Sequence, residues 1–186
     1  MRRETSVGVR RVRGALVVVL SMLIVLALAT VMSAGTSGAG ASPVARCTSA
    51  QLRVSIGRAN GAAGTIYYPI VFTNEGARCA IWGVPSVQPV GVGRRPVGPP
   101  ATNASVGQMP RHLVVGLRQS VSAGFGVAET GNYPAARCGA RSIVGVRISV
   151  AGFVGTTVRP LRTSVCTRVA STHTQLLVAG TSGAGA

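Results

Sequence analysis

Apolar and polar side chains alternate over several short stretches of the chain after position 50. Residues 52–56 read Leu, Arg, Val, Ser, Ile, and this period of two places every other side chain on one face of a strand. Residues 66–72 repeat the pattern around Pro69; because proline lacks an N–H donor, it indicates an edge strand or a bulge. The same reading predicts further strands at 80–82, 86–90, 113–115, 121–128, 143–150, 154–158 and 175–178.

Turn-forming residues separate these stretches. Asn74, Glu75 and Gly76 form one such turn, and residues 91–110 are a long irregular segment rich in Gly and Pro. Nothing after Met32 shows a sustained helical period. We therefore expect an all-β domain over residues 42–178, an immunoglobulin-like two-sheet β-sandwich of about seven to nine short strands. An open barrel is the alternative.

The N-terminal segment has a different character from the rest of the chain. Five arginines occur before position 14, and residues 15–32 are an apolar run of eighteen residues with two polar interruptions. This pattern is typical of export. Residues 1–41 are then a signal peptide cleaved before Ser42, or a helical membrane anchor followed by a linker of Gly, Ala and Ser, because eighteen residues fall between the two usual lengths. Both alternatives predict an extracytoplasmic domain, secreted or held at the cell envelope.

An eight-residue sequence of small residues occurs twice, at 34–41 and again at 179–186. Gly, Ala, Ser and Thr in this proportion bury little apolar surface. We interpret 179–186 as a flexible tail.

Four cysteines follow the export segment: Cys47, Cys79, Cys138 and Cys166. An even number outside the cytoplasm predicts two disulfides, and four cysteines allow three connectivities. We favour Cys47 with Cys79 and Cys138 with Cys166, because both loops are then short and separate. The wide spacing lacks the close pairs of a structural zinc site, so no metal is expected.

All of the basic side chains are arginines, and acidic side chains are scarce. From Ser42 onward, fourteen Arg stand against two Glu. Such an excess favours an anionic partner, which outside a cell means lipid head groups, a wall polymer or a glycan. Nucleic acid is not expected, because the arginines are scattered and aromatic residues are few. Alternatively, the charge reflects composition alone and keeps the domain soluble.

Arg94, Arg95 and Arg111 flank the long irregular segment, and we predict them as anion-binding residues, since loops on a rigid scaffold commonly carry binding. The alternative is that they are solvated loop charges. The function that we favour is a non-enzymatic, envelope-associated binding module for an anionic surface or polymer. A protein–protein interaction or adhesion module that uses a sheet edge or an apolar patch is the alternative.

Groups that support catalysis are few. The exported part holds only His112, His173, Glu75 and Glu129 as candidate bases or acids, whereas a nucleophilic site needs a base and an orienting acid beside the nucleophile. We predict no catalytic residue and no cofactor. We expect Trp82 to pack in the core beside Cys79, and stacking on a sugar is its alternative role.

Several short motifs resemble one family of secreted or membrane-tethered actinobacterial proteins, domain of unknown function 4232. These are Cys47 ahead of a strand, the segments 61–65 and 71–76, and above all 79–85, which reads Cys-Ala-Ile-Trp-Gly-Val-Pro. Val84 stands where the family more often has an aromatic residue. Cys138 and Cys166 fit the family's second cysteine pair. The resemblance implies a β-sandwich in an exported protein and no established activity.

Overall fold

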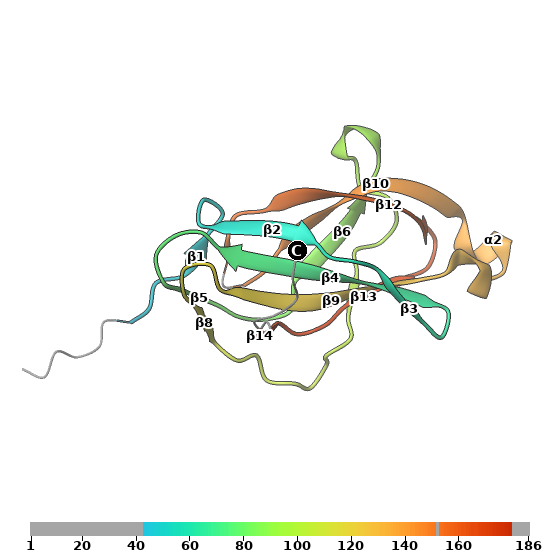
Figure 1. The fold of residues 1–186 in the computed structure, drawn as a ribbon. Helices are drawn as coiled ribbons and strands as arrows, with labels where there is room; N and C mark the ends of the chain where they lie inside the picture. Colours follow the sequence, from blue (N-terminus) through green and yellow to red (C-terminus); the bar gives the residue numbers. More distant parts are fainter. Residues whose placement is uncertain (1–42, 152, 180–186) are drawn as a thin grey trace, which may run out of the picture. The chain divides into compact units, whose positions relative to one another are not determined.

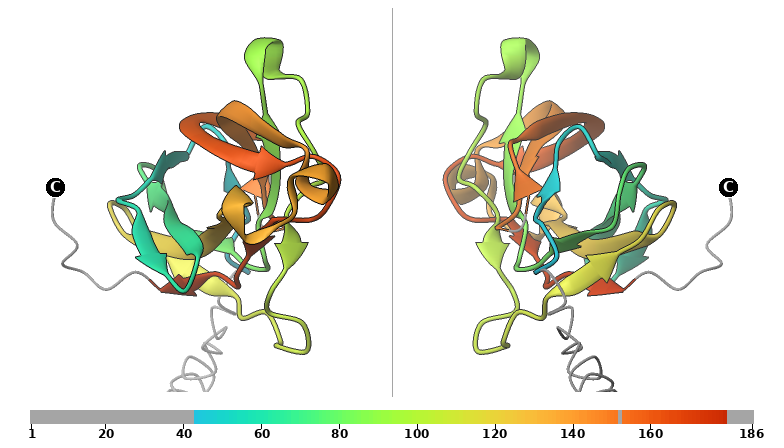
Figure 2. Two further views of the ribbon diagram at one scale, coloured as in Figure 1. Left: turned by 90° about the vertical axis from the view of Figure 1, so that its right-hand side faces the viewer. Right: turned by 90° about the vertical axis from the view of Figure 1, so that its left-hand side faces the viewer.

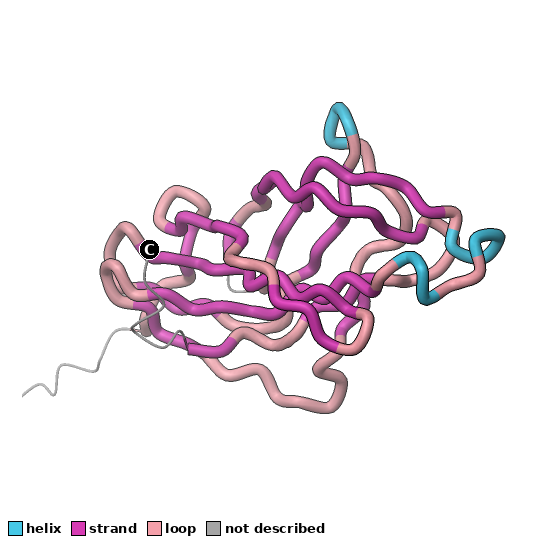
Figure 3. The backbone as a smooth tube through the Cα atoms, turned by 45° about the vertical axis from the view of Figure 1, so that its right-hand side comes forward, coloured by secondary structure: helices cyan, strands magenta, loops and turns pink. Residues whose placement is uncertain are grey.

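Strands make up about half of the described residues, 43–151 and 153–179, of the computed structural model (Figure 1, Figure 3). The largest sheet has seven strands in the order β2-β4-β9-β13-β7, with β3 beside β4 and β14 beside β9. Their bounds are β2 (Leu52–Ile56), β3 (Asn60–Ala62), β4 (Thr65–Asn74), β7 (Thr102–Asn103), β9 (Ser120–Ala128), β13 (Thr172–Thr174) and β14 (Val178–Ala179).

A second sheet has three strands in the order β12-β10-β6. Two further sheets are strand pairs, β1 with β11 and β5 with β8. The bounds are β1 (Cys47–Thr48), β5 (Cys79–Ile81), β6 (Ser86–Val90), β8 (Leu113–Val115), β10 (Ala140–Ser149), β11 (Phe153–Val154) and β12 (Thr157–Cys166). The short helical turns η1 (Val92–Arg94), η2 (Thr130–Asn132) and α2 (Ala135–Cys138) complete the described elements.

The seven-stranded and three-stranded sheets share one apolar core, so the fold is β-sandwich-like. Ile70, Phe72 and Phe125 of the larger sheet and Val146 and Ile148 of the smaller belong to a single cluster and are fully buried. Along one side the sheets also meet edge to edge, where the Arg159 guanidinium of β12 donates a hydrogen bond to the Val54 carbonyl of β2. Figure 2 shows both sheets end-on around this core.

Both disulfides have the favoured pairing. Cys47 is bonded to Cys79 and Cys138 to Cys166. The unit from Pro43 to Ala186 thus carries its own core and its own disulfides, which is the usual criterion for a domain that folds alone. The predicted N-terminal signal or anchor helix lies outside the described residues. Of the predicted tail 179–186, the structure describes Ala179 alone, and this residue belongs to β14. No helix among the described residues is long and apolar enough to span a membrane.

Two predicted strands were wrong in their bounds. The expected strand 154–158 is divided, because Gly155 has a φ of 119° between the end of β11 and the start of β12. Of the expected strand 175–178, residues 175–177 lie between β13 and β14, and Val178 begins β14. There the Leu177 N–H donates to the Gly83 carbonyl and the Leu176 N–H to the Ser105 hydroxyl, so these amides bond to loops and not to a ladder.

Pro69 is not in an edge strand, because β4 pairs with β9 on one side and with β2 and β3 on the other. Its ring lies where that second pairing is interrupted, opposite Gly57, whose N–H donates to the Pro69 carbonyl at 2.7 Å. The N and carbonyl of a strand residue point to the same side. The Pro69 nitrogen, which carries no hydrogen, therefore points to the gap between β2 and β3. The pairing of β4 with β9 on the other side loses no hydrogen bond and is continuous.

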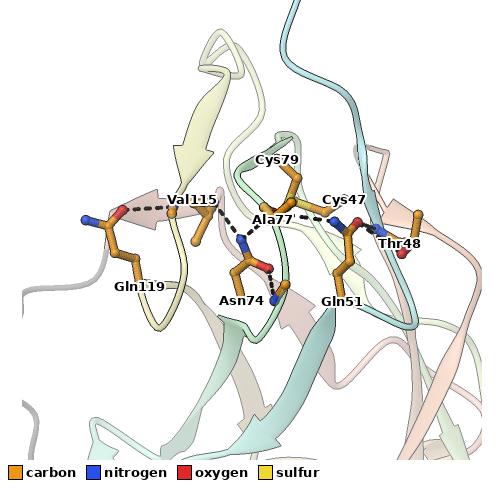
Figure 4. The surroundings of a disulfide bond; sticks show 10 residues. Cys47, Thr48, Gln51, Asn74, Ala77, Cys79, Val115 and Gln119 are labelled. Carbon is orange, nitrogen blue, oxygen red and sulfur yellow. Dashed lines mark hydrogen bonds between the residues drawn. A yellow bond between two sulfur atoms is a disulfide. The ribbon is translucent and has the colours of Figure 1, made fainter.

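Asn74, at the end of β4, is fully buried and connects three parts of the fold. Its side-chain amide donates to the Ala77 carbonyl at 2.9 Å and to the Val115 carbonyl of β8 at 2.8 Å. Its side-chain oxygen accepts the Gly76 N–H at 2.9 Å and closes the predicted turn. Figure 4 shows these bonds beside the Cys47–Cys79 disulfide. Asn74 therefore ties the seven-stranded sheet to the β5–β8 pair.

Replacing Asn74 with Ala should lower the free energy of unfolding by about 3 kcal/mol, because each buried group left without a partner costs roughly 1 to 3 kcal/mol. Urea unfolding of the oxidised domain measures this loss. Asn60→Ala is the matched control, since Asn60 is exposed on β3, and it should change stability by less than about 0.5 kcal/mol. Equal effects of the two substitutions would contradict the role of Asn74.

Candidate functional site

The outer face of the β5–β8 pair carries the candidate site. Cys79, Ala80 and Ile81 pair with Val115, Val114 and Leu113 in antiparallel register. Because side chains alternate across a strand, Cys79, Ile81 and Val115 point inward, and each is at most 1% exposed. The outer face then carries Arg78 and Trp82 from one side and His112 and Val114 from the other.

Trp82 and His112 are the next pair of opposed residues after Ile81 and Leu113, the last pair of the β5–β8 ladder. Their rings are stacked, with centroids 4.2 Å apart and planes inclined by 13°. The Arg46 guanidinium carbon lies 5.1 Å from the centre of the Trp82 ring, within the range of a cation–π contact. We call Arg46, Arg78, Trp82, His112 and Val114 the aromatic–arginine patch.

The expectation that Trp82 packs in the core was wrong. Its side chain is half-buried, whereas Ile81 and Gly83 on either side are buried. The strand alternation explains this, since a buried Ile81 turns its neighbour outward. Trp82 lies at the domain surface and contacts a cation and an imidazole ring.

The disulfide and the backbone hold Arg46 close to Trp82. Cys47, next to Arg46, is bonded to Cys79 of β5. Arg46 and Ala80 form a parallel bridge, and the Ala80 N–H donates to the Ala45 carbonyl at 2.8 Å. Three chain segments that are distant in sequence thus meet at one surface.

The three predicted anion-binding arginines do not lie together. Arg94 and Arg95 belong to the η1 loop, where the Arg147 guanidinium donates to the Arg94 carbonyl at 2.9 Å. Arg111 precedes His112 and so lies beside the aromatic–arginine patch. Figures 1 and 2 show the η1 loop and the β7–β8 loop on opposite sides of the domain, at the top and at the bottom of these views. All three side chains are exposed.

The arginines as a group are at the surface and mostly without acidic partners. Twelve of the fourteen in the described part of the chain are exposed, and Arg147 and Arg159 are half-buried. Arg53 with Glu75 is the one ion pair found among the described residues. Positive charge is therefore exposed over much of the domain surface.

The two carboxylates of the domain lie at opposite ends of one strand pair. Glu75 follows the end of β4 near Ser120, whereas Glu129 follows the end of β9 near Thr65. Eight strand steps separate these ends, or roughly 27 Å, far more than a carboxylate pair for glycoside hydrolysis spans. Glu129 lines a shallow depression of about 300 Å³ together with Thr163 and Ser164.

The second histidine belongs to a different part of the fold. The His173 ring packs edge-on against Tyr67 at 5.5 Å and lies over Gly126, where an added Cβ would be 2.3 Å from the ring. His173 therefore fills a space that only glycine leaves open. Within the described ranges, no three His, Cys, Asp or Glu side chains gather as a metal would require.

Removing the Cys47–Cys79 bond by the double change to Ala should cost about 3 to 4 kcal/mol of stability, by the loop-closure argument. Trp82 is the single tryptophan of the chain, so its emission reports on the patch. We expect emission at longer wavelength in this variant, measured below its unfolding transition, because Trp82 becomes more hydrated.

The matched control removes Cys138–Cys166, which closes a loop of similar length at the α2 end of the domain. It should lose similar stability and leave the Trp82 emission unchanged. The same red shift in both variants would show that the Cys47–Cys79 bond does not specifically order the patch.

A comparison with family models matches residues 47–180 to a domain of unknown function, DUF4232. No curated protein and no solved structure matches the chain. The matched range contains both disulfides and every residue of the patch except Arg46. The family model covers most of the chain, and this protein therefore belongs to the DUF4232 family.

Proposed function

We propose that this domain is a non-enzymatic, extracytoplasmic module that binds an anionic surface or polymer. The observation that carries the proposal is the excess of exposed arginine, with fourteen Arg and two Glu in the domain and one ion pair among its described residues. A surface of this kind attracts polyanions over the distance that salt screening permits.

The aromatic–arginine patch and its neighbour Arg111 are the contact region that we propose. Arg46, Arg78 and Arg111 are exposed, and guanidinium groups bind phosphate and carboxylate oxygens through paired donors. The patch is held by a disulfide and a strand pair, so little backbone conformational entropy is lost on binding. The η1 loop, with Arg94 and Arg95, is the second basic region.

The test is binding of the oxidised Pro43–Ala186 domain to long-chain polyphosphate across a salt series. Affinity should fall steeply with salt, because bound counterions are released. Neutralising Arg46, Arg78 and Arg111 together to Gln should make the slope of log affinity against log salt shallower by about two, at roughly 0.7 per lost contact.

The control variant removes the same charge elsewhere by changing Arg137, Arg141 and Arg162 to Gln, three exposed residues outside the patch. It should bind nearly as the parent does, and the Arg94→Gln, Arg95→Gln variant measures the η1 loop. Equal losses in both triple variants would show that contact is spread over the whole surface. Absent or salt-indifferent binding would overturn the proposal and favour a protein partner.

We also propose that the sandwich is immunoglobulin-like. This assignment is supported by the packing of the seven-stranded and three-stranded sheets around one core. The exported location is supported by the two disulfides, which persist in oxidising compartments.

A further inference from the structure

The loop that leads into the patch is held at both ends and exposed in between. At its start, Ser105 is buried, its N–H donates to the Asn103 side chain and its hydroxyl accepts the Leu176 N–H at 2.9 Å. At its end, β8 pairs with β5. All seven residues from 106 to 112 are exposed, and we call them the 106–112 loop. Figure 2 shows the β7–β8 connection extending away from both sheets.

Two large apolar side chains of this loop are almost fully exposed. Met109 is 84% exposed and Val106 is 81% exposed, although solvation of such side chains is unfavourable. Val114 of the neighbouring patch is 44% exposed. Both loop ends are fixed, and between them these side chains lie in solvent and not in the core. Two exposed apolar side chains in the same loop as Arg111 are thus open to contact with a partner.

Positive charge lies within this loop and on the strand pair that it leads into. Arg111 lies in the loop, Arg46 and Arg78 lie in the patch, and no acidic residue occurs between Glu75 and Glu129. Interfacial membrane binding combines buried apolar side chains with attraction of cations to anionic lipids. Tryptophan beside arginine is also typical of the head-group layer.

We propose that the 106–112 loop and the aromatic–arginine patch dock the domain on an anionic lipid bilayer. Met109 and Val106 enter the boundary between head groups and acyl chains, and Arg46, Arg78 and Arg111 bind lipid phosphates. This inference rests on the proposed function and narrows its ligand to a membrane surface, in preference to a soluble polymer.

The position of the apolar run in the sequence is consistent with docking of this face on the bilayer. Arg46 of the patch follows the apolar run 15–32 after thirteen residues, which reach at most about 45 Å when extended. Of the residues in the patch, Arg46 is the nearest to that run along the chain. A retained anchor would therefore hold this face within reach of the bilayer, and a cleaved one would leave the docking surface to act alone.

The experiment measures binding of the oxidised Pro43–Ala186 domain to phosphatidylcholine vesicles with and without an equal part of phosphatidylglycerol, and to long-chain polyphosphate. We expect binding to the anionic vesicles, with Trp82 emission moving to shorter wavelength. The Val106→Ser, Met109→Ser variant should bind these vesicles about tenfold more weakly or worse, if each side chain buries about one methylene. Its affinity for polyphosphate should not change.

The matched control is Val92→Ser with Val144→Ser, since both valines are exposed outside the loop and the patch. It should bind vesicles as the parent does. If the loop variant binds vesicles as tightly as the parent, or if polyphosphate binds and vesicles do not, the membrane inference is overturned and the proposed function stands. If neither probe binds, both are overturned.

Discussion

The buried amide of Asn74 is the contact on which the arrangement of this domain depends. Its side chain forms hydrogen bonds both within its own turn and to Val115 of β8. These bonds fix the position of the β5–β8 pair relative to the end of the large sheet. The Cys47–Cys79 bond lies beside it and adds the first strand to the same junction. Such a buried amide favours one arrangement of the two sheets, because any other arrangement would break one of these hydrogen bonds and leave a buried polar group without a partner.

This junction determines which side chains of the small sheet reach solvent. With Ile81 and Val115 buried beneath it, the alternation of the strands turns Trp82 and His112 outward. Their stacking and the approach of Arg46 follow from the register and the disulfide, and not from local sequence preference. The surface that we propose as functional is therefore a consequence of the same packing that stabilises the core.

The excess of arginine has a different origin from these contacts. With two carboxylates in the domain, most arginines cannot be neutralised within the protein, whatever the fold. Their number depends on composition alone, but their distribution depends on the fold. Arg94 and Arg95 belong to the η1 loop and Arg111 to the β7–β8 loop, and the structure places these two loops on opposite sides of the domain.

The sequence by itself determined the features that depend on residues close together along the chain. The strand at Leu52–Ile56 follows from alternation, the turn after Asn74 from its short polar side chain, and the family from its motifs. The disulfide pairing was favoured on loop length and is confirmed. Only the tertiary structure decided the burial of Asn74, whose partner Val115 is 41 residues away, and the exposure of Trp82, which stacks on His112. The physical reason is that side-chain burial depends on what packs against a strand, and no local pattern specifies a partner so far along the chain.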